Sequence, residues 1–373
     1  MERIEKLDTA PAIGLIALKG TEKWVDGIAY YLKQIYEMKD IQVINLNLPR
    51  FSTGDAKGVL NETVRGMDVF ILVDVGNYDC EYAMFNRKSF MSPDEHFQDL
   101  KRTISAIGGK ADRITVIMPM LYAARQDRRL LRESLDCAVA LRELENMGVK
   151  NIMSFDVHDD RVSNAVPFVS FDNLMPTYQV IKALNRDFPE VVTEKNQLVV
   201  VSPDVGATNR NILYSTELDT EMGLFYKRRS RDVMVDGQYP ITVHKYIGPD
   251  VKGKDVFIYD DIIASGGTML DVMKKMKDMG ARKVFVAVTF GLFTEGVEKF
   301  NRAYEEGLFD AIFSTNATYR SPELLNEPWY KEVDLTKYMA YYVYCINQGK
   351  SISQILNPHV KIHELIDHSR EGQ

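Results

Sequence analysis

Short runs of apolar residues recur along the chain and alternate with longer segments in which apolar residues follow a helical period. The runs are rich in β-branched side chains and lie at residues 12–18, 69–75, 114–120, 198–202, 256–259 and 284–290. Runs that are apolar on both faces are typical of parallel strands covered by helices on both sides. The pattern therefore predicts an α/β protein with doubly wound parallel sheets.

The chain length of 373 residues predicts two domains of ordinary size, each with its own core. We expect the break near Met175 and Pro176, after the irregular stretch 159–173 and before a helix that tolerates an early proline. The predicted domains are residues 1–175 and 176–350, followed by a polar tail at 351–373 whose final part, 358–373, is expected to fray. Helices are expected at 269–279, which stops at Gly280, and around 335–347.

Charge and composition restrict the class of protein. The formal net charge of −7 disfavours a nucleic-acid partner, so any phosphate has to be bound by a few local groups. The odd number and wide spacing of Cys80, Cys137 and Cys345 predict reduced structural thiols rather than a disulfide framework or a zinc motif. Residues 1–9 lack the apolar core of a signal peptide, and no apolar run is long enough for a bilayer. We therefore expect a cytoplasmic protein with no membrane partner.

The most informative segment is 256–268, in which a strand leads into two acids and a loop of small residues that opens a helix. Backbone N–H groups of Ser265-Gly266-Gly267-Thr268 can form an anion-binding nest, and the glycines permit close approach of a phosphate. Asp260 and Asp261 can accept hydrogen bonds from ribose hydroxyls or hold a metal-bound water. The alternative is an acidic strand end followed by an ordinary glycine turn.

Three segments of the first half place polar side chains in predicted loops. Arg50-Phe51-Ser52-Thr53-Gly54-Asp55 presents a carboxylate, although a plain surface turn has the same composition. In 122–128, Arg125 supplies a planar fork for phosphate or adenine, and Gln126 can bind purine edges. His158 follows a strand and is a candidate for the metal side, either as a ligand or through a water, since Mg²⁺ prefers oxygen ligands.

Two further segments lie in the second half. Asp204, in Ser202-Pro203-Asp204-Val205-Gly206-Ala207, follows a strand and is either a metal ligand or a helix cap. Segment 227–231 holds four cations in five residues, so it either meets a polyanion or forms a solvated hairpin tip.

Segment 256–268 resembles the phosphoribosyl-binding loop of the phosphoribosyltransferase superfamily, and the complete set of segments resembles the ribose-phosphate pyrophosphokinase family. The resemblance implies ATP binding by Phe51, Thr53, Gly54, Asp55, Arg125 and Gln126, with loop 51–55 serving a neighbouring subunit's site. It implies ribose 5-phosphate binding by Asp260, Asp261, Ala264, Ser265, Gly266, Gly267 and Thr268. It also implies Mg²⁺ as the cofactor, with His158 and Asp204 on the metal side, and Lys227 and Arg229 as the catalytic cations.

The resemblance implies two similar phosphoribosyltransferase-type domains, a homo-oligomer of dimers stacked into hexamers, and transfer of the β,γ-diphosphate of ATP to ribose 5-phosphate. Thr53, Ala207 and Ala264 depart from the family's usual residues. Two alternatives stay open: a phosphoribosyltransferase that consumes phosphoribosyl diphosphate, and a catalytically silent homologue that regulates an active enzyme.

Overall fold

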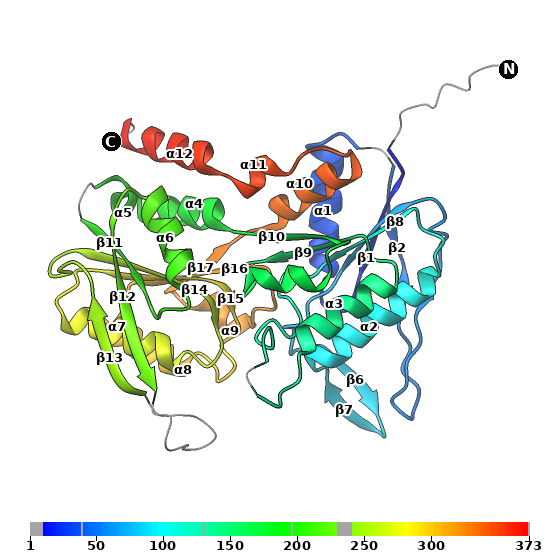
Figure 1. Cartoon of the computed structure of the whole chain (residues 1–373), viewed down its shortest axis with the longest axis horizontal. Coiled ribbons are helices and arrows are strands. Elements are labelled where there is room, and N and C mark those ends of the chain that lie inside the picture. Colours follow the sequence, from blue (N-terminus) through cyan, green and yellow to red (C-terminus); the bar gives the residue numbers. More distant parts are fainter. Residues whose placement is uncertain (1–9, 39, 130, 195–196, 230–240, 372–373) are drawn as a thin grey trace. The chain divides into compact units, whose positions relative to one another are not determined.

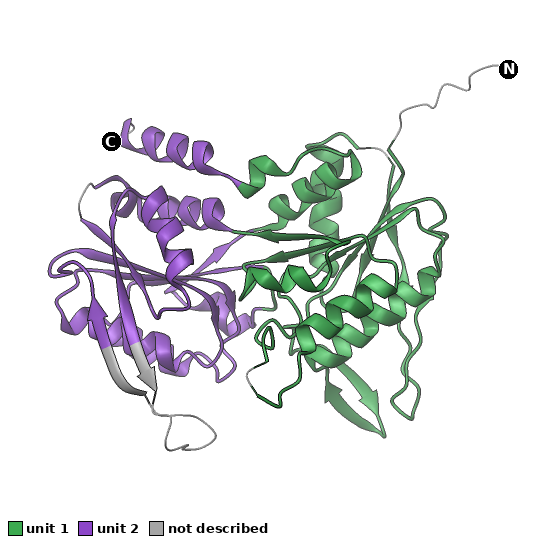
Figure 2. Ribbon diagram, in the orientation of Figure 1, with its two compact units in different colours: residues 1–175, 317–319, 335–356 green, residues 176–316, 320–334, 357–373 purple. Residues whose placement is uncertain are grey.

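A computed structural model describes residues 10–371 except 39, 130, 195–196 and 230–240, and describes the backbone alone at 227–229 and 241–244. The chain divides into two compact units (Figure 2). Unit 1 comprises Met1–Met175, Ala317–Tyr319 and Leu335–Leu356, and unit 2 comprises Pro176–Asn316, Arg320–Asp334 and Asn357–Gln373.

Unit 1 is built on a six-stranded sheet in which all neighbours are parallel, in the order β10-β9-β8-β5-β1-β2. Helices α2 and α3 pack on one face, and α1 and α10 pack together on the other (Figure 1). Two small antiparallel pairs, β3 with β4 and β6 with β7, project from the connections. The strands are β1 Ile13–Ala17, β2 Ile41–Ile44, β3 Leu46–Asn47, β4 Val59–Leu60, β5 Asp68–Leu72, β6 Glu81–Met84, β7 Arg87–Phe90, β8 Arg113–Ile117, β9 Asn151–Phe155 and β10 Ser170–Leu174. The helices are α1 Glu22–Gln34, α2 Pro93–Ile107, α3 Asp136–Asn146, α10 Thr336–Asn347 and α11 Ser353–Leu356, with a 3₁₀ helix at Asp160–Ala165.

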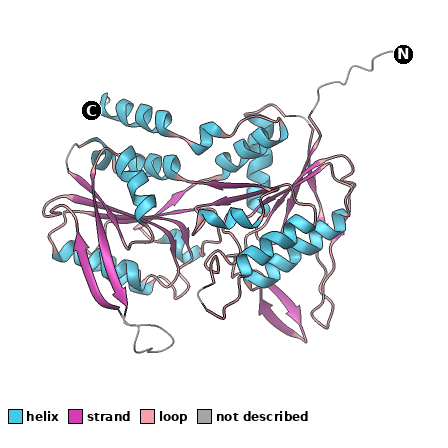
Figure 3. Ribbon diagram, viewed as in Figure 1, coloured by secondary structure: helices cyan, strands magenta, loops and turns pink. Residues whose placement is uncertain are grey.

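Unit 2 is built on a seven-stranded sheet in the order β13-β12-β11-β14-β15-β16-β17, where β12 and β13 alone pair antiparallel (Figure 3). Helices α7 and α8 pack on one face around Phe300 and Trp329. The strands are β11 Leu198–Ser202, β12 Glu221–Arg229, β13 Ile241–Ile247, β14 Asp255–Ile263, β15 Val284–Gly291, β16 Ala311–Thr315 and β17 Tyr330–Val333. The helices are α4 Thr177–Asp187, α5 Pro189–Thr193, α6 Thr208–Glu217, α7 Gly267–Asp278, α8 Glu298–Glu305, α9 Pro322–Asn326 and α12 His359–Glu371.

Several central strands are buried along their whole length, which is why their sequences are mostly apolar. Every residue of β5, β11 and β15 is buried. Helices on both faces exclude water from both sides of these strands. The predicted α/β class with doubly wound parallel sheets is confirmed, as are the predicted strands. Helix α7 ends before Gly280, whose φ of +89° is the left-handed conformation that glycine adopts after a helix.

The C-terminal part of the chain is organised differently from the prediction. The units meet in sequence at Met175 and Pro176, where the break was expected, but 335–350 belongs to unit 1 instead of the second domain. The reason is a set of tertiary bonds: Tyr342 donates to Asp172 over 2.7 Å, and the Asn347 amide donates to Asp68 over 3.1 Å.

The predicted tail at 351–373 is likewise divided between the units. Helix α11 lies in unit 1, whereas α12 lies in unit 2 and packs against α4, α5 and α6. Ile362 and Ile366, one helical turn apart, are buried in that contact. The expectation of a frayed end is therefore wrong for residues 359–371.

Two predictions from composition can be compared with the fold. Cys80, Cys137 and Cys345 are buried and free, as expected for structural thiols. Burial raises the pKa of the Cys137 thiol to about 12. Within the described residues, no helix has both the length and the apolar character needed to cross a membrane.

Each sheet has one place where the chain order reverses. In unit 1 the chain passes from β1 to β2 on one side and later to β5 on the other, so the switch point lies between β1 and β5. In unit 2 it lies between β11 and β14. Open α/β sheets bind ligands at the carboxyl ends of the strands that flank such a point.

Candidate functional site

Three carboxylates gather at the switch point of unit 2. Asp260 and Asp261 lie near the carboxyl end of β14, and Asp204 follows the neighbouring strand β11. The Asp261 amide donates to Asp260 Oδ1 over 2.9 Å. Burial first, and then the charges of Asp261 and Asp204, raise the pKa of Asp260 well above its usual value. This concentration of negative charge favours a bound cation or hydroxyl donors.

Side chains of α6 hold the acid pair in place. Asn211, which is fully buried, donates to the carbonyl of Tyr259 over 2.8 Å and accepts from the Tyr259 amide over 3.1 Å. Arg210 lies 3.6 Å from Asp261 Oδ2. These contacts fix β14 immediately before Asp260. Neither residue was predicted, and the available signal was a polar asparagine on the buried face of an amphipathic helix.

The turn before α7 leaves backbone amides available at the start of a helix. Gly266 has a φ of +83°, and a Cβ there would lie 2.2 Å from the ring of Phe300. A Cβ on Gly267 would meet nothing within 4 Å, and Gly267 and Thr268 are exposed. No described side chain caps this helix. Unpaired N–H groups and the helix dipole make such a turn suited to an anion.

Asp204 closes the turn that precedes α6. Its Oδ1 accepts from the Ala207 amide over 3.0 Å, and the Ser202 hydroxyl donates to its carbonyl over 2.6 Å. Ala207 is buried and has a φ of −83°, so this position does not require glycine. The departure from the family residue at Ala207 is therefore compatible with the turn.

Strand β12 extends beyond the carboxyl edge of β11. Leu224 pairs with Ser202, the last residue of β11, and β12 continues to Arg229 in an antiparallel pair with β13. At about 3.3 Å per residue, the backbone of Lys227 lies roughly 10 Å past that edge. The side chains of Lys227 and Arg229, and all of Ser230 and Arg231, lie outside the described residues.

In unit 1, Arg125 and Gln126 are exposed on the loop after β8. The loop is anchored by Tyr122, whose ring stacks on Phe97 with centroids 4.4 Å apart and whose hydroxyl donates to Asp94 over 2.6 Å. The Gln126 amide then donates to the carbonyl of Ala123, which has a φ of +54°. The turn thus presents both polar side chains to solvent.

His158 is exposed on the loop after β9, the strand beside β8. Asn173 fixes this loop, because its Oδ1 accepts from the Val157 amide over 3.0 Å and its amide donates to Asp160. The guanidinium of Arg161 lowers the pKa of the neighbouring Asp159 to about 2. An ionised carboxylate therefore stands next to His158 throughout the physiological range.

Loop 51–55 is a tight turn between β3 and β4, where the adjacent Arg50 bonds to Asp99 of α2 over 2.7 Å and Gly54 lies against Met84 of β6. The Phe51 amide donates to the Asp55 carbonyl over 2.7 Å, and the Thr53 hydroxyl donates to the Asp55 carboxylate over 2.9 Å. Phe51 is 49% exposed. Thr53, which departs from the family's usual residue, thus supplies a hydrogen-bond donor for Asp55.

Comparisons with known proteins agree with this geometry. Residues 15–148 match the model for the N-terminal domain of ribose phosphate pyrophosphokinase, and residues 171–314 match the phosphoribosyl transferase domain. A ribose-phosphate pyrophosphokinase from Mycoplasma pneumoniae is 30% identical over 83% of this chain and 87% of its own. The chain belongs to the ribose-phosphate pyrophosphokinase family. A second member, from Vibrio cholerae, is 29% identical over 85% of this chain and 92% of its own.

The fold of the family is also found in a solved structure. A crystal structure of phosphoribosylpyrophosphate synthetase from Mycobacterium smegmatis covers 90% of this chain and 99% of that chain, with a TM-score of 0.74 at 21% identity. The predicted phosphoribosyltransferase-type fold is thereby confirmed.

Within each unit, the structure brings together part of the predicted pyrophosphokinase site. Asp204, Asp260, Asp261 and the 264–268 turn share the carboxyl ends of two paired strands of unit 2. Arg125, Gln126 and His158 follow two paired strands of unit 1. Loop 51–55 follows neither of these strands and instead connects β3 with β4.

Proposed function

We propose that this protein is a ribose-phosphate pyrophosphokinase that transfers the β,γ-diphosphate of ATP to ribose 5-phosphate. The C1 hydroxyl attacks the β-phosphorus, the bond from that phosphorus to the α,β-bridging oxygen breaks, AMP leaves, and the hydroxyl proton passes to solvent. The observation that carries the proposal is the exposed glycine turn beside an acid pair at the switch point of unit 2.

Unit 2 would bind the sugar phosphate. The amides of 265–268 would donate to the 5-phosphate, helped by the dipole of α7 and the hydroxyls of Ser265 and Thr268. Asp260 and Asp261 would accept from the ribose hydroxyls. Because Asn211 fixes the strand before them, the two acids are held in place before the substrate arrives.

The donor set of this site fits magnesium. Asp204, Asp260 and Asp261 supply the hard oxygen ligands that Mg²⁺ prefers. Burial, and then repulsion from Asp261 and Asp204, raise the pKa of Asp260, and a divalent cation would relieve that repulsion. We propose that Asp204 and His158 hold the metal ion, with His158 acting either as a direct ligand or through a water. When bound, Mg²⁺ neutralises charge on the diphosphate.

Unit 1 would bind ATP through Arg125 and Gln126, whose exposed side chains suit phosphate or adenine contacts. Lys227 and Arg229 would stabilise the negative charge that builds on the transferring diphosphate. We also propose a homo-oligomer in which Phe51, Thr53, Gly54 and Asp55 serve a neighbouring subunit. The exposure of Phe51 on this connecting loop supports this assignment.

The test is AMP production by the purified protein given Mg-ATP with and without ribose 5-phosphate. We expect AMP release that depends on the sugar phosphate. A Lys227→Ala, Arg229→Ala double variant should lower kcat by about 100-fold or more, because each cation contributes a few kcal/mol of transition-state stabilisation. A Lys252→Ala, Lys274→Ala double variant removes two exposed cations of unit 2 and should keep wild-type turnover.

Two results would contradict the proposal. Diphosphate release from phosphoribosyl diphosphate that depends on a nucleobase, without AMP formation from ATP, would identify a phosphoribosyltransferase. Absence of AMP at any nucleotide and magnesium concentration, in protein that stays folded, would identify a catalytically silent homologue.

A further inference from the structure

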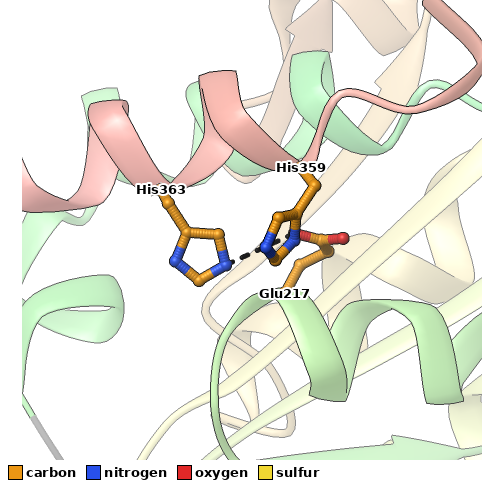
Figure 4. Close-up of side chains that lie close together, drawn as sticks. All are labelled: Glu217, His359 and His363. Atoms are coloured by element: carbon orange, nitrogen blue, oxygen red, sulfur yellow. Dashed lines mark hydrogen bonds and ion pairs between the residues drawn. The ribbon is translucent and has the colours of Figure 1, made fainter. Parts of the chain in front are cut away.

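Two histidines of α12 and a glutamate of α6 meet on the surface of unit 2, away from the strand ends that form the proposed site. Glu217 is the last residue of α6, and His359 and His363 lie in the first turns of α12 (Figure 4). His359 Nδ1 lies 3.0 Å from Glu217 Oε2, and His363 Nε2 lies 3.7 Å from the same oxygen. One ligand atom from each residue falls within 4.8 Å of the other two.

The three side chains converge because of where their helices place them. Residues four apart share one face of a helix, so the two imidazole rings lie together with centroids 4.2 Å apart. Both rings point toward the carboxylate of Glu217, which is only 6% exposed (Figure 4). A buried carboxylate is costly unless a cation or hydrogen-bond donors compensate it.

A hydrogen bond from His359 satisfies only part of this cluster. His363 Nε2 is shielded from solvent and makes no hydrogen bond within the described residues, and 3.7 Å is too long for one to Glu217. A buried ring nitrogen aimed at a carboxylate that already has one imidazole partner is left without a hydrogen-bond partner of its own. A metal ion bound by all three atoms would satisfy this nitrogen.

The spacing and the donors suit a tetrahedral transition metal. Nitrogen and oxygen ligands about 2.0–2.1 Å from zinc lie roughly 3.3 Å from one another, close to the separations of 3.0 and 3.7 Å found here. Two imidazoles with one carboxylate form a donor set typical of Zn²⁺, whereas Mg²⁺ prefers oxygen alone. A His-x₃-His pair on one helix is a recurrent zinc-binding arrangement.

We propose that Glu217, His359 and His363 bind one Zn²⁺ or a similar divalent transition-metal ion, which fastens α12 to α6. The side chain of His359 is 53% exposed, which leaves room for a water as the fourth ligand. Glu217 and Thr208 lie at opposite ends of α6, about 14 Å apart at 1.5 Å per residue. The zinc site is thus distinct from the turn of Asp204, and its role is to hold the C-terminal helix.

The first measurement is zinc binding by the full chain after chelator treatment, by competition with a chromophoric chelator in excess Mg²⁺. The excess Mg²⁺ suppresses zinc binding at the carboxylates of the proposed catalytic site. We expect one zinc equivalent per chain that is lost, or bound at least tenfold more weakly, in His363→Ala. That ring makes no hydrogen bond, so the variant should stay folded without metal.

The control is His368→Ala, which removes an exposed histidine from the same helix and should bind zinc as the wild type does. Zinc should also slow amide hydrogen exchange in α12 of the wild type and of His368→Ala, but not of His363→Ala. Equal zinc binding by His363→Ala and the wild type, or no zinc equivalent in the wild type, would overturn the proposal. Because these readouts need no catalysis, they are independent of the proposed pyrophosphokinase activity.

Discussion

The switch points of the two units have the same topology but opposite local chemistry. In unit 2, the turn between β14 and α7 has exposed glycine backbone, no side-chain cap, and three carboxylates nearby. In unit 1, the turn between β1 and α1, which matches the β11–α6 turn in strand order, is filled by neighbouring side chains. The Gly20 amide there donates to the Glu22 carboxylate over 2.9 Å.

Further contacts fill the unit 1 switch point. A Cβ on Gly20 would lie 2.4 Å from the Asn77 amide nitrogen and 2.9 Å from Cys80 Sγ. The buried carboxylate of Asp74 accepts from the Gly76 amide and the Thr318 hydroxyl, each over 3.0 Å. A protein carboxylate and packed side chains thus occupy the place where a phosphate would bind. The comparison teaches that a helix start of this fold is suited to an anion only where side chains leave the space before its amides open.

The largest expected effect is a difference in stability between variants of Gly266 and Gly267, the two neighbouring glycines of the unit 2 turn. Gly266→Ala places a Cβ against Phe300 at a positive φ, so we expect a loss of about 3 kcal/mol in the free energy of unfolding. Gly267→Ala has room for its Cβ and should stay as stable as the wild type while raising the KM for ribose 5-phosphate about tenfold or more. Chemical denaturation and steady-state kinetics measure both. Equal KM values for Gly267→Ala and the wild type would contradict binding of ribose 5-phosphate at this turn.

A smaller effect on the free energy of unfolding is expected from substitution of Asn211, whose side chain bonds α6 to β14. Asn211→Ala leaves the buried amide and carbonyl of Tyr259 without their side-chain partner, which should cost about 2 kcal/mol in the free energy of unfolding. Ile212→Ala, at an exposed neighbour on the same helix, is the control and should cost less than about 1 kcal/mol. If the two variants unfold at the same denaturant concentration, Asn211 does not position the acid pair.

The outer loops of unit 1 can be tested through Arg125. Because this side chain is exposed, Arg125→Ala should leave the thermal midpoint unchanged while raising the KM for ATP about tenfold, or about 1.4 kcal/mol. Arg125→Lys should recover part of the loss, since it keeps the charge but not the planar fork. Arg142→Ala, at an exposed arginine of α3, is the matched control. An unchanged KM for ATP in Arg125→Ala would contradict the assignment of Arg125 to nucleotide binding.

The smallest expected effect is a pH-dependent change in stability that comes from the ionisation of Asp260. Burial first, and then the charges of Asp261 and Asp204, raise the pKa of its carboxyl, so its ionisation destabilises the folded protein as the pH rises above the usual value of 3.8. Asp260→Asn should therefore stabilise the metal-free protein at pH 7 by on the order of 1 kcal/mol, with a gain that vanishes as the pH falls toward 4. Denaturation in chelator over this pH range tests it, with the exposed Asp271→Asn as control. A gain that is independent of pH would contradict the electrostatic cause.

Sequence reasoning worked best where the signal is local and continuous. Strands such as β11 and β15 are almost entirely apolar because they are buried on both faces, and β11 matches its predicted bounds of 198–202. The edge strand β2 has partly exposed residues and gives no such run. The glycine turn and the adjacent acids were predicted for the same reason, since the required residues are consecutive.

The remaining features depend on partners that are distant in sequence. Asn211 bonds to Tyr259, which lies 48 residues later in the chain. Glu217 meets His359 only because α12 folds back over α6. Helix α10 joins unit 1 through Asp172 and Asp68, which lie more than 150 residues earlier in the chain. No local pattern specifies such contacts, so the tail was expected to fray.

The most direct test of the proposed function is a ³¹P NMR time course of the purified protein with Mg-ATP and ribose 5-phosphate. The proposal predicts equal amounts of AMP and of a sugar-linked diphosphate, with both phosphates transferred as one unit. Accumulation of ADP with a new phosphate monoester or free phosphate, or AMP formation that does not require the sugar, would contradict transfer of a β,γ-diphosphate to ribose 5-phosphate.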